Sequence, residues 1–512
     1  MLLYPLRNDR QADSVYSLSA FVPAAEVNRE SWTTSGEVAD LHASLADACP
    51  ALQDLLAPMD EALITGIYFR DPLESWGTDR VTLLGDAAHP APPSAGQGAG
   101  MALEDAVMLA ACLRRAGPGN EPAALREYAF RRQPRTARML ESSRVNLGNS
   151  QTSDPVQVRA RNGYYRGLER LSPAGPPMQE WLLAHDPVAA AEGSPEEFGR
   201  DLIAVRNPMR RPRARQAFDL WQTALTGEHR AAGWLGQRQG YADFLRDRLH
   251  RANPGPSWPT AVISCDGTPA RQVGRPSRDD APVVLHLHGG GYSMGSAELA
   301  APLAGRLAAA VGGWSLVPDY RLAPEHPFPA GSRDVLAAYR WLARRYPRAP
   351  ILLSGECAGG GLALGLALAL RDCGGPDSRR PAGIHLVSPF WDLALPAEDL
   401  GPAADSDPWL NRIALIQLAA CYIHDADPSQ WPVSPGRADL SGLPPLLIQA
   451  AEPEALFASA TRLADQARRA GVAVTFSPVA DSVHSFVLFD FLPETDRALA
   501  EFAAFAQAVR AV

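Results

Sequence analysis

The feature that most constrains the fold is a glycine-rich turn between a short apolar segment and a longer one. Residues 349–353 predict a buried strand, and residues 362–370, in which Leu alternates with Ala or Gly, predict a buried helix. Gly355–Gly359 (Gly-Glu-Cys-Ala-Gly) connects them and permits a sharp turn. This turn lifts Cys357 above the strand, toward a helix N-terminus whose free N–H groups favour negative charge. The alternative is a glycine-rich turn that holds an inert, buried cysteine.

Two further motifs precede this turn. His288–Tyr292 (His-Gly-Gly-Gly-Tyr) follows an apolar strand at residues 282–287, and residues 319–330 read Asp-Tyr-Arg-Leu-Ala-Pro-Glu-His-Pro-Phe-Pro-Ala. With the Gly-x-Cys-x-Gly turn, they resemble the hormone-sensitive-lipase group of carboxylesterases over about residues 200–512. The resemblance implies an α/β-hydrolase fold, a mostly parallel sheet with a helical cap, and Cys357 as nucleophile. It also implies an oxyanion hole made by backbone N–H groups, which we expect from Gly289, Gly290, Gly291 and Ala358.

The same resemblance implies that the acid and the histidine follow the nucleophile in that order. A strand at residues 446–450 precedes Glu454, which falls where the family has its acid; Glu452 is the fallback, and a surface glutamate is the alternative. A strand at residues 472–476 precedes His484, which falls at the position of the catalytic histidine. The expected triad is therefore Cys357, His484 and Glu454.

Two departures from the family pattern affect the chemistry. Cys357 replaces serine, and Glu356 replaces the usual aspartate. A thiol ionises more easily than a hydroxyl, and His484 and the helix N-terminus favour the thiolate. The acyl-enzyme would be a thioester, which acylates amines, thiols and carbanions well, so that hydrolysis and acyl transfer both stay open. A degenerate, catalytically silent site is the competing interpretation.

A different motif occupies the first part of the chain. Residues 80–90 predict an apolar strand that runs into Gly85-Asp86, and a proline- and glycine-rich loop and a helix follow. This closely resembles the second flavin-contacting motif of the class A flavoprotein aromatic hydroxylases, of the salicylate and p-hydroxybenzoate hydroxylase type. The resemblance implies that Asp86 accepts hydrogen bonds from the ribityl chain of FAD. It implies that the loop from Pro93 to Gly100 brings backbone N–H groups close to the isoalloxazine ring. The cofactor-binding residues that it implies besides Asp86 are Gly85, Pro93, Gly96, Gly98, Ala99 and Gly100.

The flanking segments resemble the same family. Residues 4–7 and 15–22 predict paired strands of its substrate sheet, residues 127–135 its long C-terminal helix, and residues 181–186 its usual ending. The family's Gly-x-Gly-x-x-Gly unit, which binds the ADP half of FAD, does not precede Gly85. We therefore expect that this chain does not hold FAD alone. A start codon placed too far downstream, a second chain that supplies the missing half, and a structural relic are the open explanations.

The length of 512 residues is too great for a single core, and we expect several domains. Residues 1–195 predict a partial FAD-dependent monooxygenase-like α+β domain, residues 196–275 a linker and helical cap, and residues 276–512 the α/β-hydrolase catalytic domain. Within the second segment, residues 260–264 and 269–273 predict a β-hairpin.

Composition excludes several classes of function. The net charge is -9 without a run of like charge, which argues against nucleic acid or an anionic membrane as partner. All 48 basic residues are arginine, which excludes a catalytic lysine. The six cysteines are scattered without a Cys-x-x-Cys pair, which predicts neither a metal site nor a disulfide framework and favours the cytoplasm. No signal peptide and no membrane-spanning run is expected.

The sequence thus predicts a hydrolase or acyltransferase that acts on a small carboxylic ester or thioester through a Cys-His-Glu triad. We expect no cofactor for the hydrolase domain and a role in tailoring an aromatic or polyketide-like metabolite, the latter by fold analogy alone. The first alternative is an FAD-dependent aromatic monooxygenase whose dinucleotide-binding half lies outside this chain, on a partner chain. The second is a catalytically silent scaffold.

Overall fold

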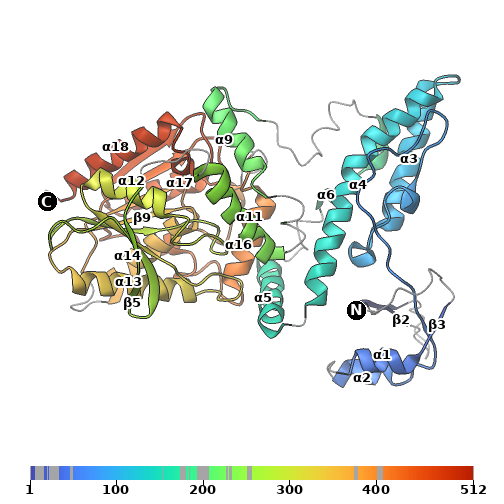
Figure 1. Cartoon of the computed structure of the whole chain (residues 1–512), viewed down its shortest axis with the longest axis horizontal. Coiled ribbons are helices and arrows are strands. Elements are labelled where there is room, and N and C mark those ends of the chain that lie inside the picture. Colours follow the sequence, from blue (N-terminus) through green and yellow to red (C-terminus); the bar gives the residue numbers. More distant parts are fainter. Residues whose placement is uncertain are drawn as a thin grey trace. The chain divides into compact units, whose positions relative to one another are not determined.

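A computed structural model of the chain contains two compact units, Met1–Gln151 and Thr152–Val512 (Figure 1). The structure describes residues 2–5, 16–19, 21, 34–46, 50–152, 154–172, 180–183, 185–192, 207–225, 229, 233–250, 257–373, 379–400 and 407–510. The domain boundary expected near residue 195 lies outside the described residues. The contacts divide the chain earlier, after Gln151, because helix α5 (Pro155–Leu171) packs against α16 (Arg412–Ile423) of the second unit.

Two glycines bring α5 close to α16. A Cβ atom on Gly167 would lie 2.4 Å from the carbonyl oxygen of Ala420, and a Cβ atom on Gly163 would overlap the ring of His424. Leu168 is buried with Ile416 and Ala420 in a small apolar cluster. At the helix surface, Arg166 forms a 2.8 Å ion pair with Asp425. Residues 155–171, which the sequence assigned to the flavin-hydroxylase part, therefore belong to the second unit.

The second unit is built on an eight-stranded sheet of order β12-β11-β10-β9-β7-β8-β6-β5. Its strands are β5 (Thr260–Cys265), β6 (Thr268–Val273), β7 (Val283–Leu287), β8 (Trp314–Pro318), β9 (Ile351–Glu356), β10 (Gly383–Val387), β11 (Leu446–Ala451) and β12 (Val474–Val479). The pairs from β8 to β12 are parallel, and β6 runs antiparallel to β8 and to β5. The predicted hairpin is thus the edge of this sheet, which begins at Thr260 and not at residue 276.

Helices cover both faces of the sheet (Figure 1). One face carries α12 (Ala301–Val311) and α18 (Pro493–Ala508); the other carries α13 (Ala330–Arg345) and α14 (Ala358–Cys373). Helix α17 (Phe457–Arg469) packs on β11 and β12. Strands β7 to β11 are buried along their whole length, as expected for parallel strands between two helical layers.

The predicted cap consists of α9 (Pro212–Gln222), α11 (Gly233–Asp243) and the π-helix η4 (Phe244–His250). Its buried Trp221 stacks on Phe244 of η4 and on Trp409, each with a ring-centroid distance of 4.8 Å. Arg211 fixes the start of α9 by ion pairs with Asp481 of the loop after β12, at 2.8 Å, and with Glu494 of α18. The cap is therefore joined to the sheet by both aromatic and charged contacts.

The first unit contains two short antiparallel pairs, β1 (Leu2–Pro5) with β2 (Tyr16–Ser19) and β3 (Ser35–Gly36) with β4 (Ala62–Leu63). The first pair agrees with the strands predicted there. Of the other residues predicted in them, Phe21 is described and lies outside the strand, and the rest lie outside the described part. Its helices are α1 (Val38–Ser44), α2 (Pro50–Leu56), α3 (Gly98–Ala116) and α4 (Glu121–Gln151), and α4 contains the predicted long helix. The prediction of a strand before Gly85 is wrong, because among the described residues that segment makes a single β-bridge, Gly77 to Thr82.

The remaining short helices are α6 (Glu180–Leu183), α7 (Pro187–Glu192), η1 (Gly85–Ala87), η2 (Pro93–Ala95), η5 (Ala397–Asp399), η6 (Pro435–Arg437) and η7 (Phe486–Leu488). Among the helices that the structure describes, none combines the length and the apolar character that crossing a membrane requires.

Candidate active site

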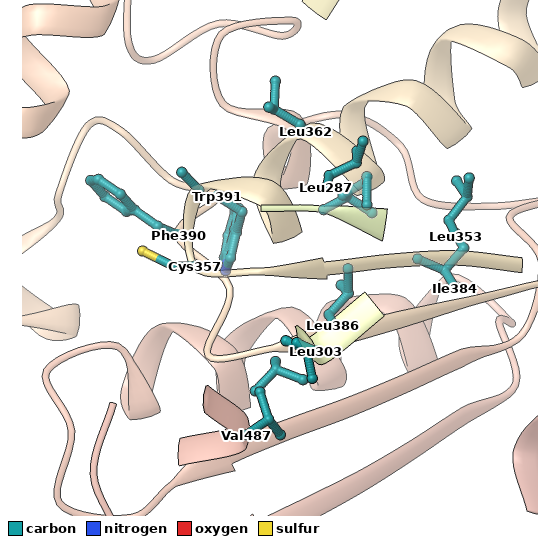
Figure 2. Packing of buried hydrophobic residues seen from close by; sticks show 14 of the residues in the cluster. Leu287, Leu303, Leu353, Cys357, Leu362, Ile384, Leu386, Phe390, Trp391 and Val487 are labelled. Carbon is teal, nitrogen blue, oxygen red and sulfur yellow. The ribbon is translucent and has the colours of Figure 1, made fainter. Parts of the chain in front are cut away.

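Cys357 occupies the turn between β9 and α14 with a positive φ of 51°. Its N–H donates to the carbonyl of Val387 at 3.0 Å, and its own carbonyl accepts from the N–H of Phe390 at 2.8 Å. A Cβ atom at Gly355 would lie 2.2 Å from the carbonyl oxygen of Gly359, so only glycine fits there. Figure 2 shows Cys357 beside Phe390, at the edge of the buried apolar cluster. Local backbone sterics thus hold Cys357 at the carboxyl end of a central strand.

His484 and Glu454 meet at the same end of the sheet. Nδ1 of His484 lies 2.8 Å from Oε2 of Glu454, and both side chains are buried. The loops after β11 and β12 carry them, and the carboxyl ends of neighbouring parallel strands lie together at one edge of the sheet. Cys357 is close enough to His484 for its side chain to raise the pKa of that histidine. Glu452, the fallback acid, is exposed.

The buried groups perturb one another electrostatically. Burial alone would lower the pKa of His484, but the charge and hydrogen bond of Cys357, together with Glu454, raise it well above its ordinary value. Burial raises the pKa of Glu454, and the hydrogen bond and charge of His484 oppose that rise. His484 therefore binds its proton more tightly than a free imidazole does.

The glycine loop after β7 faces the Cys357 turn. The N–H of Gly289 donates to Oε1 of Glu356 at 2.5 Å and is therefore engaged, although the sequence predicted it as an oxyanion donor. Gly290 and Gly291 have positive φ values of 106° and 59°, and Ala358 is the first residue of α14. None of these three N–H groups donates to another described residue. Three of the four expected donors thus remain available for a substrate oxygen.

Ser485 is a site residue that the motif analysis missed. Its hydroxyl donates to Oε2 of Glu356 at 2.6 Å and lies 3.1 Å from Nε2 of His484. Burial raises the pKa of Glu356, while the hydrogen bond from Ser485, the charge of His484 and the N–H of Gly289 oppose that rise. Its role could have been predicted from its position directly after His484, because the hydroxyl of the next residue can reach the histidine ring.

Three buried tyrosines lie near the nucleophile, although the sequence motifs did not predict them. One comes from the cap, and the other two from the loops after β7 and β8. Tyr241 of α11, Tyr292 and Tyr320 are buried close enough to Cys357 for its charge to act on their hydroxyls. Burial is the main cause that raises the pKa of all three hydroxyls well above the ordinary value, and the charge of Cys357 adds to it. All three are therefore neutral groups around the nucleophile.

In the first unit, the Gly85 turn is held by a buried ion cluster. The carboxylate of Asp105 accepts from the N–H of Gly85 at 3.0 Å, lies 2.7 Å from Nε2 of His89, and accepts from Nε of Arg132 at 2.6 Å. Asp86 itself is exposed, and one of its carboxylate oxygens would lie 3.8 Å from a Cβ atom on Gly98. The structure thus brings Asp86 to the N-terminus of α3.

The predicted flavin loop is partly helical, because η2 covers Pro93–Ala95 and α3 already begins at Gly98, with Ala99 and Gly100 in its first turn. Gly96, with a φ of 65°, has open space where a Cβ atom would stand. The exposed Asp86 and this helix N-terminus fit the ribityl and ring end of a flavin. No described segment before Gly85 forms a strand, glycine loop and helix, so the ADP end has no counterpart there. Among the described residues, no cluster of His, Cys, Asp and Glu is arranged to hold a metal ion.

Comparisons with known proteins match both parts of the chain. Residues 284–488 match the family model of the alpha/beta hydrolase fold, and residues 19–143 match that of an FAD binding domain. An acetyl-hydrolase of Streptomyces hygroscopicus is 38% identical over 227 residues, which cover 44% of this chain and 75% of that protein. The carboxylesterase NlhH of Mycobacterium tuberculosis (strain ATCC 25618 / H37Rv) is 37% identical over 227 residues, covering 41% and 68%.

Solved structures agree with these matches. The crystal structure of an esterase from the bacterial hormone-sensitive lipase family superposes with a TM-score of 0.53 and 34% identity, covering 58% of this chain and 98% of that chain. A mutant of the esterase E40 gives a TM-score of 0.54 at 34% identity, with coverages of 58% and 99%.

Proposed function

The chain belongs to the alpha/beta hydrolase family that includes these esterases, and on that premise we propose that Cys357 takes the acyl group of a carboxylic ester or thioester. One observation carries the proposal: the cysteine in the sharp turn between β9 and α14 raises the pKa of a buried histidine, which is paired at 2.8 Å with a buried glutamate. Ester hydrolysis follows from the family; the cysteine nucleophile and the thioester intermediate are the proposed part.

The first half-reaction would form the thioester. The Cys357 thiolate attacks the substrate carbonyl carbon, and the developing oxyanion is stabilised by the N–H groups of Gly290, Gly291 and Ala358. His484 then gives the proton on Nε2 to the leaving alkoxide or thiolate, the bond from carbon to the leaving group breaks, and the thioester remains. Glu454 orients the imidazole through Nδ1 and stabilises its charged form.

The second half-reaction would release the acyl group. His484, now neutral at Nε2, accepts a proton from water, an amine or a thiol, whose oxygen, nitrogen or sulfur attacks the thioester carbonyl. The carbon–sulfur bond breaks and the Cys357 thiolate returns. A thioester is more reactive toward amines and thiols than an oxygen ester, so an acceptor other than water fits a cysteine at this position.

The cap favours a substrate with a flat apolar part. Trp221 and Tyr241 of the cap stack on Trp409, with centroids 4.8 Å and 5.7 Å apart, and Trp221 donates to the backbone carbonyl of His484. Aromatic faces pack well against other rings. Because acetyl-hydrolases are among the similar proteins, acetyl esters of aromatic or polyketide-like alcohols are the first substrates to test.

Trapping the acyl-enzyme tests the proposal. The protein is mixed with an activated acetyl ester, quenched in acid and digested, and the expected result is an acetyl group on Cys357. Cys357→Ala should lower turnover by several powers of ten, because the triad acts as a unit. Cys357→Ser should retain some hydrolysis but lose transfer to an amine or thiol.

Iodoacetamide gives a second measurement with an internal control. Inactivation should follow alkylation of Cys357, and a Cys373→Ser variant, which removes an exposed thiol, should be inactivated as fast as the natural chain. Unmodified Cys357 in an inactivated enzyme, or activity that persists in Cys357→Ala, would overturn the assignment.

An FAD-dependent aromatic monooxygenase is the second candidate, supported by the match of residues 19–143 and by the exposed Asp86. We propose that this chain alone does not retain the cofactor, because the residues that the structure describes form no cradle for the ADP end. The purified chain should then show no flavin absorption and no saturable fluorescence change with added FAD. Micromolar binding that Asp86→Ala weakens would instead favour a flavoprotein.

A further inference from the structure

Two glutamates reach His484 from opposite sides of its ring. Glu454 lies 2.8 Å from Nδ1, whereas Glu356 acts at the other nitrogen through Ser485, whose hydroxyl lies 3.1 Å from Nε2. We propose that Glu356 and Ser485 form a second, positioning branch that holds a proton on Nε2 of His484, so that Cys357 rests as a thiolate. The inference rests on the proposed function, since it concerns the same nucleophile.

The directions of the hydrogen bonds around Ser485 indicate whether Nε2 of His484 carries a proton. Both oxygens of the Glu356 carboxylate accept, one from the N–H of Gly289 at 2.5 Å and one from the Ser485 hydroxyl at 2.6 Å. Because the Ser485 proton is directed at Glu356, only lone pairs of its oxygen face His484. An acceptor at Nε2 requires an N–H there, while Nδ1 donates to Glu454. As long as the Glu356 carboxylate is ionised, His484 therefore carries protons on both nitrogens and is an imidazolium.

The charged surroundings agree with this state. The groups that face His484 are Cys357 from the elbow, Glu454 from the loop after β11 and Glu356 from the end of β9; Asp407 lies near Glu454. All of them are acidic. Among the described residues, neither Glu356 nor Glu454 forms an ion pair with an arginine, so the imidazolium is the cation that compensates their burial.

The branch also joins the two loops of the site. Glu356 accepts hydrogen bonds from two loops and so connects them. One comes from Gly289 in the loop after β7, and the other from Ser485 in the loop after β12. Ser485 has a φ of 49°, and its N–H donates to the hydroxyl of Ser388 at 3.2 Å, which fixes the direction of its side chain. A serine nucleophile would need a neutral histidine to remove its proton, whereas a cysteine is most reactive as a thiolate beside an imidazolium. The branch therefore suits sulfur at position 357.

The experiment measures how the rate of iodoacetamide alkylation at Cys357 depends on pH, by peptide mass spectrometry, in Ser485→Ala, Ser485→Gly and Glu356→Gln. Glycine at 485 removes the hydroxyl without straining the positive φ, so this variant remains informative if a larger change impairs folding. Each variant should move the half-maximal pH upward by about one unit, the size expected for one hydrogen bond to a charged group. At neutral pH, turnover should fall by about tenfold. A higher pH should not restore it, because the leaving group still needs the proton on His484.

Matched controls remove a buried serine hydroxyl and a buried glutamate elsewhere. Ser315→Ala breaks a 2.7 Å bond to the carbonyl of Ala304, and Glu494→Gln alters a glutamate paired with Arg211 and Arg497. Both should keep the half-maximal pH of the natural chain. A folded Ser485→Gly protein with that same value would overturn the branch while leaving Cys357 as nucleophile. If Cys357 of the natural chain resists alkylation and activity persists, the proposed function and the branch both fail.

Discussion

Trp221 of the cap donates its indole N–H to the backbone carbonyl of His484, at 2.9 Å. The residue is fully buried, and its ring is stacked against Phe244 and Trp409. The cap therefore does more than cover the site: it fixes the backbone of the loop that carries the base, while Glu454 fixes the ring.

Trp221→Phe should test this link, because it keeps an aromatic ring and removes the donor. The carbonyl of His484 would be left unsatisfied, at a cost of about 1–3 kcal/mol. We expect a lower free energy of unfolding and a lower kcat, measured by denaturant titration and steady-state kinetics. Trp314→Phe is the matched control, since Trp314 is equally buried and its indole nitrogen has no hydrogen-bond partner. If both variants lose kcat equally, the hydrogen bond has no special role.

The assignment of the acid predicts a large difference between two neighbouring glutamates. Glu454→Gln removes the buried charge next to Nδ1 of His484, and turnover should fall by roughly a hundredfold or more. Glu452→Gln changes an exposed residue and should leave kcat nearly unchanged.

The pH dependence adds a second readout. Glu454 helps to raise the pKa of His484, so its loss lowers that pKa. The protonated histidine exists only below its pKa, and the alkaline limb of kcat/KM should therefore move to lower pH. The opposite ranking of the two variants would transfer the role to Glu452, and two equally small effects would leave Cys357 and His484 as a dyad.

Docking of α5 on α16 predicts where the second unit begins. A chain that starts at Thr152 keeps α5 and should melt like the second unit of the full protein. A chain that starts at Asn207 exposes Ile416 and Ala420 and should melt at a lower temperature.

A point substitution checks the same contact within the full chain. Gly167→Leu places a side chain against the carbonyl of Ala420 and should cost about 1–3 kcal/mol through overpacking. Glu169→Leu, on the exposed side of the same helix, is the control and should change stability little. Equal melting temperatures for the two start positions would show that α5 adds nothing to the second unit.

The buried cluster around Asp105 predicts a stability effect in the first unit. Asp105→Asn leaves Arg132 buried without its closest partner, and breaking a buried ion pair costs about 3–5 kcal/mol. The control Asp79→Asn breaks an exposed pair with Arg126 and should cost under about 1 kcal/mol. Denaturant unfolding of a fragment of residues 1–151 should distinguish the two variants by their free energies of unfolding. If both variants lose equally little stability, the cluster does not stabilise the turn at Gly85.

The contribution of Asp105 to the stability of the first unit depends on pH. Burial raises the pKa of Asp105, but His89, Arg132 and the N–H of Gly85 outweigh it and leave the pKa below its ordinary value. Because the folded pKa is the lower one, the contribution is complete above the unfolded value of about 3.9 and is lost as pH falls through the folded value.

The motifs determined the fold of the second unit and the residue types of its site. The α/β-hydrolase fold with a preceding FAD-binding domain, predicted from the glycine-rich turns, is confirmed by the sheet and by the family and structural matches. These motifs can be recognised in the sequence because each one is local. The steric crowding at Gly355 and the positive φ of Cys357 depend on residues only a few positions away.

Only the tertiary structure decided which groups touch. Ser485, Trp221 and Gly289 acquire their partners across long separations in the chain, through the parallel sheet and the cap, and no periodicity marks such pairs. For the same reason the sequence did not show that the sheet begins at Thr260, since β6 pairs with the edge of β8 only after folding. Nor did it show that α5 belongs to the second unit, since Gly167 approaches Ala420 only in the folded protein.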